Sequence, residues 1–101
     1  MRMMMRVQFP IEPFNGLVRN GAAGSKMMKI LDEIKPEAAY FGSQDGKRGG
    51  ILIIDVAKPS DIPRLAEPWF LNFNADVEFS AVMTPDDLVE ADLLTLGKKW
   101  G

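Results

Sequence analysis

The sequence predicts an α+β protein built on a four-stranded antiparallel sheet, and three observations lead to this fold class. The segment Gly50–Ala57 is a short apolar run rich in β-branched residues, which is typical of a central strand covered on both faces. Segments of alternating apolar and polar residues lie before and after it, as half-buried strands require. Amphipathic segments stand between the strands, so the elements follow the order β-α-β-β-α-β with one further helix at the end. That order is the split βαβ, or ferredoxin-like, pattern, for which we expect the strand order 4-1-3-2.

The first half of the chain supplies a strand and a helical region. Met3–Phe9 alternates between apolar and polar faces, which predicts the first strand. A helical region follows from about Phe14 to Ile34. Gly21 and Gly24 weaken its middle, because each costs about 1 kcal/mol relative to alanine in a helix. Whether this region forms one helix or two stays open.

A hairpin is expected to lead into the central strand. Glu37–Ser43 predicts the second strand, and Gln44–Gly49 predicts the loop that follows it. Within this loop, Asp45 and Gly46 form the dipeptide that is most typical of a tight hairpin turn. The third strand then enters through Gly50.

The rest of the chain predicts a helix, a strand and a terminal helix. Ser60 or Asp61 can cap the helix, whose apolar positions share one face, and Pro68 is expected to kink or break it before Trp69. Ala75–Val82 alternates cleanly and predicts the fourth strand. The terminal helix begins at Thr84-Pro85-Asp86-Asp87, which combines a cap, a proline in the first turn and two acids. It continues with apolar residues at helical spacing: Val89, Leu93, Leu96 and Trp100. Whether it docks on its own subunit or on a partner stays open.

Composition limits the class of function. The 101 residues, 47% hydrophobic and 26% charged, predict one globular domain over positions 1–101 and exclude disorder. A net charge of −2 favours neither nucleic acid nor an anionic membrane as partner. No apolar segment has the length of a signal-peptide core or a membrane span, so we expect a cytoplasmic protein. The chain has no cysteine and no histidine, which removes thiol chemistry and the commonest metal ligand. We therefore expect no metal and no cofactor.

One face of the predicted sheet needs a partner. The helices cover the face that carries Leu52, Ile54 and Val56, so Ile51 and Ile53 face the other way. The same second face also carries Met4, Asp55 and several polar residues: Arg6, Gln8, Asp76, Glu78 and Ser80. Phe41 could also lie on this surface, which is too apolar for open water and too charged for a plain core. A second copy packed on it would bury the apolar side chains and leave a polar cleft, so we expect a homodimer.

Arg6, Asp55 and Glu78 are the candidate site. The first strand lies between the third and fourth, so Arg6 is expected to be flanked by the two carboxylates. Arg6 would then orient an anionic or carbonyl group, and a carboxylate of raised pKa would move a proton. The alternative is a structural ion pair at a dimer interface.

Further residues complete the predicted ligand-binding set. It consists of Arg6, Gln8, Tyr40, Asp55, Trp69 and Glu78. Trp69 and Phe70, with Tyr40 and Phe41, would wall an apolar pocket, whereas the simpler interpretation of aromatics at such spacing is that they belong to the core.

Two segments carry a resemblance to a known superfamily. They are Lys35-Pro36-Glu37-Ala38-Ala39-Tyr40-Phe41 and Ala66-Glu67-Pro68-Trp69-Phe70. With the element order and the length, they resemble small uncharacterised proteins of the dimeric α/β-barrel superfamily. That superfamily is similar in fold to muconolactone isomerases and antibiotic-biosynthesis-type monooxygenases, whose sites lie between the helices and the barrel interior. Relatives of this kind place a histidine in the site, and this chain has none.

The sequence therefore predicts a homodimeric domain that binds a small apolar-anionic molecule in a cleft at the sheet. The alternative is a cofactor-independent isomerase or monooxygenase acting on a small cyclic or aromatic compound. RNA-recognition modules share the fold pattern, but Ile51 and Ile53 stand where such a module needs aromatic residues that stack on bases. Asp86 and Asp87 belong to a helix start rather than to a metal site.

Overall fold

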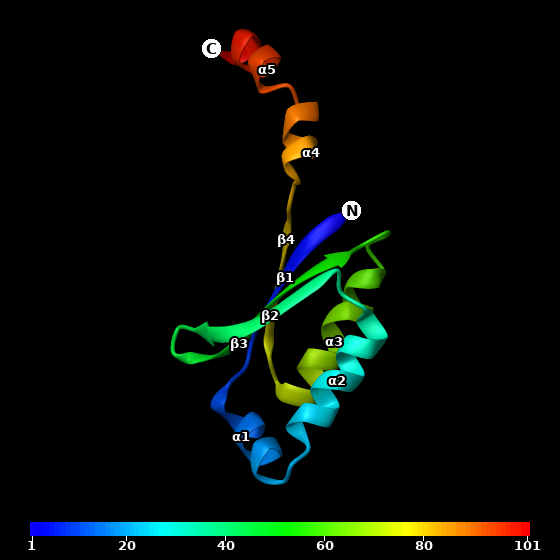
Figure 1. Cartoon of the computed structure of the whole chain (residues 1–101), viewed down its shortest axis with the longest axis vertical. Helices are drawn as coiled ribbons and strands as arrows, with labels where there is room; N and C mark the ends of the chain where they lie inside the picture. Colours follow the sequence, from blue (N-terminus) through cyan, green and yellow to red (C-terminus); the bar gives the residue numbers. More distant parts are fainter.

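The computed structural model describes all 101 residues, and its centre is a four-stranded antiparallel sheet (Figure 1). The strands are β1 (Arg2–Gln8), β2 (Ala38–Gln44), β3 (Lys47–Asp55) and β4 (Asp76–Ala81). Their order in the sheet is β2-β3-β1-β4, and every neighbouring pair is antiparallel. The predicted ferredoxin-like topology is confirmed, with the apolar strand β3 in an interior position.

The hairpin between β2 and β3 is tighter than predicted. Only Asp45 and Gly46 lie outside the strands, with φ of 52° and 76°. Positive φ at both central positions is the geometry of a type I′ turn, which joins two strands without a longer loop. The prediction of a loop over Gln44–Gly49 was therefore wrong, because the turn closes within two residues and pairing extends up to it.

Three helices cover one face of the sheet: α1 (Ile11–Arg19), α2 (Ala23–Ile34) and α3 (Asp61–Phe73). The region from Phe14 to Ile34 is thus two helices, separated by a turn at Asn20–Ala22. The helices α2 and α3 run beside each other along the sheet, as Figure 1 shows. The core between the two layers joins residues from β1, β3 and all three helices with Phe9, which follows β1. Its members include Met5, Val7, Phe9, Phe14, Ile30, Leu52, Ile54, Leu65, Trp69 and Phe73.

Helix α3 is continuous through Pro68, contrary to the predicted break before Trp69. A proline inside a helix leaves the carbonyl four residues earlier without its usual partner. That residue is Arg64, which is exposed, so solvent can supply the bond that Pro68 cannot. The helix also keeps its apolar face in place, since Leu65, Ala66, Trp69 and Phe73 are all buried. Core packing on both sides of Pro68 therefore stabilises the helical path.

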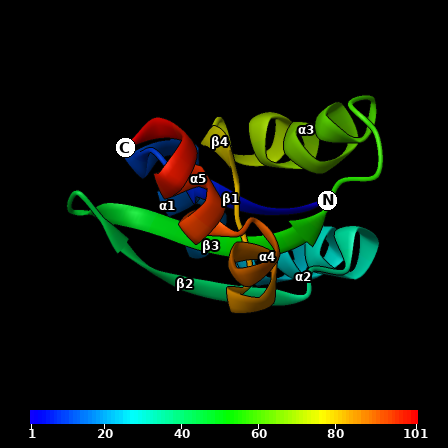
Figure 2. The ribbon, with the colours of Figure 1, turned by 90° about the horizontal axis from the view of Figure 1, so that it is seen from above.

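The C-terminal segment is two short helices rather than one, and it stands apart from the rest. The helices are α4 (Pro85–Glu90) and α5 (Leu93–Trp100), separated at Asp92, whose φ of 55° is left-handed. We call residues 82–101 the arm. It projects beyond the end of β4, away from the sheet and its helices (Figure 1), and it buries no residue in either helix. Seen along the long axis, α4 and α5 stand in front of the end of the sheet (Figure 2).

The arm makes the molecule elongated. Its radius of gyration is 17.0 Å, with extents of 59 × 28 × 19 Å. A compact chain of this length has a radius of gyration of about 13 Å. No helix in the chain has the length and apolar character that crossing a membrane requires.

Candidate functional site

The sheet face that no helix covers carries the candidate site, and we call it the open face. Strand alternation places one residue of each strand in a row across it. The central row is Tyr40 on β2, Ile51 on β3, Arg6 on β1 and Glu78 on β4. Ile51 is half-buried, whereas Tyr40 is 72% exposed. The row therefore places a guanidinium between an apolar half and a carboxylate.

The rows on either side differ in polarity. Toward the start of β1 the row is Ala38, Ile53, Met4 and Ser80, which is mainly apolar. Toward the β2–β3 turn the row is Gly42, Gly49, Gln8 and Asp76, which is polar. The open face thus changes from apolar at the end where the arm leaves to polar at the turn end. Phe41 is not part of it, because its partner in the register is Gly50 and it lies on the helix side.

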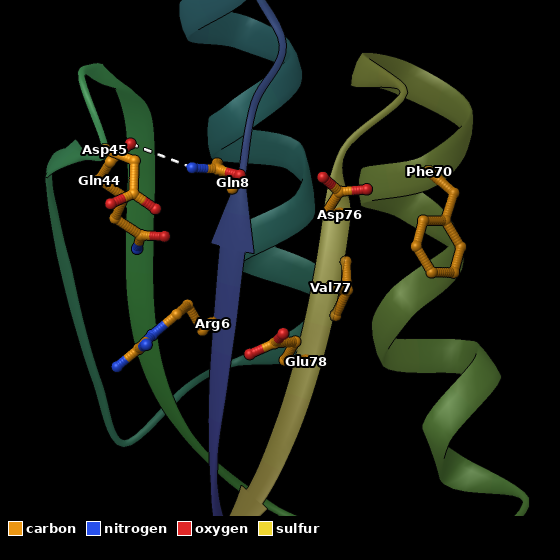
Figure 3. A pocket seen from close by; sticks show the side chains of 8 residues that line it. All are labelled: Arg6, Gln8, Gln44, Asp45, Phe70, Asp76, Val77 and Glu78. Atoms are coloured by element: carbon orange, nitrogen blue, oxygen red, sulfur yellow. Dashed lines mark hydrogen bonds between the residues drawn. The ribbon is translucent and has the colours of Figure 1, made fainter.

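A hollow of about 680 Å³ lies at the polar end of this face (Figure 3). Its lining consists of Arg6, Gln8, Gln44, Asp45, Phe70, Asp76, Val77 and Glu78. One guanidinium therefore faces three carboxylates, and the lining is mostly polar.

Arg6 has no ionic partner within the chain. The four ion pairs of the protein join other groups, and no hydrogen bond is made by the Arg6 guanidinium. Figure 3 shows its side chain extending from β1 toward β2 and β3, with Glu78 on the β4 side. A guanidinium offers five N–H donors in a planar fork that matches carboxylate or phenolate oxygens. These donors are available to a ligand.

The second arginine of the open face, Arg2, is fully engaged. Its Nε and Nη2 donate to the two carboxylate oxygens of Glu37 at 2.8 and 3.0 Å. This hydrogen bonding, with the attraction of the Arg2 charge, lowers the pKa of Glu37. Of two arginines on the same face and strand, one is held by a bidentate ion pair and one is free, which distinguishes Arg6 from a structural cation.

A pair of glutamines forms the floor of the hollow near the turn. Gln8 Nε2 donates to the backbone oxygen of Gln44 at 3.0 Å, and Gln44 Nε2 donates to the backbone oxygen of Gly50 at 3.1 Å. The Gln44 side chain lies over Gly49, where a Cβ atom would collide with it. The ligand-binding set predicted from the sequence contains Gln8 but not Gln44. The signal was present in Gly49, since a glycine within a strand marks a close approach.

Asp55 is not part of this site. It lies on the open face as predicted, but it pairs in the register with Arg2 rather than with Arg6. Its carboxylate accepts a hydrogen bond from the N-terminal amine of Met1 at 3.1 Å, and its side chain is 80% exposed. Four residues of strand separate Asp55 from Ile51, which is about 13 Å. The expected flanking of Arg6 by two carboxylates is thus reduced to Glu78 alone.

Trp69 lies on the other side of the sheet. It is fully buried and packs against Phe9 and Phe73, with ring centroids 5.9 and 6.2 Å away. Its Nε1 atom has no hydrogen-bond partner. The structure therefore places Trp69 in the core, the simpler of the two interpretations, and leaves Tyr40 as the predicted aromatic that faces the open side.

No group of three or more carboxylates converges closely enough to hold a metal ion. The chemistry that the open face offers is hydrogen bonding and charge from Arg6, apolar contact from Ile51 and Tyr40, and proton acceptance by Glu78.

Comparison with known proteins gives a likeness of fold. No protein-family model and no curated protein sequence matches the chain. Among solved structures, the chain is similar to a 5-chloro-2-hydroxyhydroquinone dehydrochlorinase from Burkholderia phenoliruptrix, in complex with 2,5-dihydroxybenzoquinone. The TM-score is 0.60 at 14% identity, over 85% of this chain and 97% of that one. A de novo designed protein, Ferredog-Diesel, matches with a TM-score of 0.48 at 8% identity, over 80% and 85% of the two chains. At these identities the likeness concerns the fold alone.

Proposed function

We propose that the open face binds a small, flat, partly apolar molecule with an anionic oxygen, in a cleft formed when two copies pair through this face. The observation that carries the proposal is the free guanidinium of Arg6 beside the apolar half of its row. A charge-assisted hydrogen bond from arginine contributes both affinity and orientation, whereas Ile51 and Tyr40 offer contact to a flat apolar body.

The pairing of two copies rests on the apolar end of the same face. Ile53 and Met4 are only half-buried in the single chain, and Ile51 continues this apolar strip toward Arg6. A strip of this kind with a polar border is typical of an interaction surface. A second copy would exclude water from the strip, and exclusion of water would strengthen the bond from Arg6 to an anion.

The class of ligand is supported by the free donors of Arg6 and by the fold neighbour. That neighbour was solved with 2,5-dihydroxybenzoquinone, a flat ring bearing acidic oxygens. The same compound is therefore a suitable first probe for this chain.

Calorimetric titration of the probe into the intact protein tests the proposal. The variant Arg6→Met should weaken binding by ~10- to 100-fold, because it removes charge-assisted hydrogen bonds. The matched control is Lys29→Met, which removes an exposed cation from α2 on the helix side. Equal affinity of the wild type and the Arg6→Met variant would refute the assignment of the site to Arg6.

A second candidate function is favoured by the position of Glu78. It lies directly opposite Arg6 in the β1–β4 register, so a base and an electrostatic stabiliser flank one point of the hollow. That pairing fits a cofactor-independent isomerase or monooxygenase. The Glu78→Gln variant separates the two functions: a binding site keeps or gains affinity for the probe, whereas an enzyme loses turnover while still binding it.

A further inference from the structure

The arm carries a stripe of apolar side chains that nothing in the chain covers. Leu93, Leu96 and Trp100 recur at helical spacing on one side of α5, and all three are exposed, Trp100 by 77%. Leu88 and Val89 add apolar surface on α4. Every residue from Pro85 to Gly101 is exposed.

Helices of this length need a surface to pack on. The helix α4 has six residues and α5 has eight. Isolated helices shorter than about 12–15 residues are marginal in water, since nucleation is costly and few hydrogen bonds repay it. Caps from Thr84 and Asp92 help each helix to begin, but they bury no apolar surface. Packing of the arm against another surface would therefore stabilise its two helices.

The arm continues beyond the end of β4 and does not fold back over its own sheet (Figure 1). Thr84 is extended, with φ of −75° and ψ of 164°, and it precedes Pro85, which disfavours a helical bend there. The capping box between Thr84 and Asp87 holds this geometry with bonds of 2.9 and 3.1 Å. The short segment between β4 and α4 therefore continues outward, as Figure 1 shows, and does not turn back.

We infer that the arm of each copy packs across the open face of a second copy of this chain. The apolar stripe of α5 would cover the apolar strip formed by Ile51, Ile53 and Met4 of the other copy. This inference rests on the pairing of two copies proposed above, and it names the segment that completes the cleft.

Charge complementarity supports this occupant. The hollow at the polar end of the open face holds one arginine against three carboxylates, Asp45, Asp76 and Glu78. The last turn of α5 carries Lys98 and Lys99. The two lysines equal the excess of two carboxylates in the hollow. The acids of the arm, Asp86, Asp87, Glu90 and Asp92, all lie before α5, whose own charges are the two lysines alone. The α5 helix of a second copy would thus bring apolar surface and neutralising charge together, and it would leave Arg6 to meet an anionic ligand.

Sedimentation equilibrium of two matched variants tests the inference. Leu96→Lys introduces a charge into the apolar stripe of α5, and Leu71→Lys does the same at an equally apolar residue of α3 that is 81% exposed. Both side chains lie outside the core, so neither substitution disturbs the packing of the sheet against its helices. We expect Leu96→Lys to weaken self-association by ~10-fold or more, and Leu71→Lys to leave it unchanged. If both variants self-associate as strongly as the wild type does, the inference is wrong.

The absence of native cysteines allows a direct test of which chain the arm meets. A Leu96→Cys chain of normal isotopic composition is mixed with an Ile53→Cys chain labelled with ¹⁵N, and disulfides are identified by mass. A mixed-mass disulfide confirms docking between chains. A second sample is a chain that carries both Leu96→Cys and Ile53→Cys. If it forms only the disulfide within one chain, the arm folds back on its own sheet and the inference is wrong.

Fluorescence of Trp100 tests whether the arm becomes covered when the copies associate. The difference between wild type and Trp100→Phe isolates this residue from buried Trp69. Its emission should shift to the blue as protein concentration rises through the dimerisation range. An emission that stays that of an exposed indole at all concentrations refutes arm docking. Ligand binding is tested separately from arm docking by the Arg6→Met variant. If this variant loses probe binding while its self-association is unchanged, the ligand site does not depend on the outcome for the arm.

Discussion

Arg6 and Glu78 lie directly opposite each other across β1 and β4, yet no ion pair joins them. Opposite charges at directly facing strand positions usually form a stabilising ion pair. Because Arg6 and Glu78 do not, both groups are available to a third group such as a ligand. The absence of a bond between Arg6 and Glu78 also argues against a purely structural ion pair. Arg2 on the same strand does form such a pair, through its bidentate bond to Glu37.

The first prediction concerns the charge of Glu78. Because Glu78 forms no ion pair, Glu78→Gln should change the free energy of unfolding by less than about 0.5 kcal/mol. The variant should also bind the anionic probe more tightly, since a negative charge leaves the hollow. Chemical denaturation and calorimetric titration measure the two effects. A large loss of stability would mean that Glu78 and Arg6 do form a structural pair.

The second prediction compares two glycines that face each other in the β2–β3 register. Gly49→Ala should destabilise the protein by about 1–3 kcal/mol, because its Cβ collides with the side chain of Gln44. Gly42→Ala should cost nothing comparable, since its Cβ meets no atom within 4 Å. Thermal unfolding measures both. Similar losses for the two variants would contradict the packing of Gln44 over Gly49.

The third prediction uses neighbouring residues on the two faces of β3. Leu52→Ala should lower the free energy of unfolding by about 2–5 kcal/mol at every protein concentration, because Leu52 is fully buried under the helices. Ile53→Ala should cost little in dilute solution and more at high concentration, where a second copy covers the open face. Denaturation at two concentrations tells them apart. A concentration-independent cost for Ile53→Ala would count against pairing through this face.

The fourth prediction is a dependence on pH at the start of the arm. The backbone N–H of Thr84, and next its side chain, bind the Asp87 carboxylate and lower its pKa below the usual value of 3.8. A lowered pKa contributes stability at higher pH, and this contribution disappears as the pH falls through the folded value. We therefore expect α4 to lose helix on acidification below the usual range of aspartate.

Nuclear magnetic resonance titration of the Asp87 carboxyl tests this dependence. In Thr84→Ala the side-chain bond is absent, so the pKa of Asp87 should rise toward its usual value. The control is Ser60→Ala at the start of α3, where no side-chain cap bond exists and no change is expected. A pKa of Asp87 that is the same in the wild type and in Thr84→Ala would contradict the capping box.

Much of the fold could be read from local patterns. Strand alternation identified which residues share the open face, and the order of elements identified the neighbours of each strand, so Arg6 and Glu78 were correctly brought together. Asp55 shows the limit of this reasoning. A period of two assigns a residue to a face, but it does not give its position along the strand, and the register placed Asp55 beside Arg2 instead.

The remaining errors arose where tertiary context outweighed a local signal. Pro68 signals a break, but buried residues on both sides of it hold α3 in one piece. Trp69 belongs to the predicted ligand-binding set, but the continuous helix α3 directs its side chain into the core instead. The division of the terminal helix depends on Asp92, a left-handed residue whose carboxylate accepts a hydrogen bond from the Thr95 N–H and caps α5. The spacing of apolar residues does not reveal such a cap.

Native mass spectrometry of the intact protein with 2,5-dihydroxybenzoquinone tests whether the open faces of two copies enclose a cleft in which Arg6 holds an anionic ligand. We predict a dimer whose mass increases by bound probe, and no such increase for Arg6→Met. A monomer, or a dimer that takes up no probe beyond what Arg6→Met retains, would contradict the account.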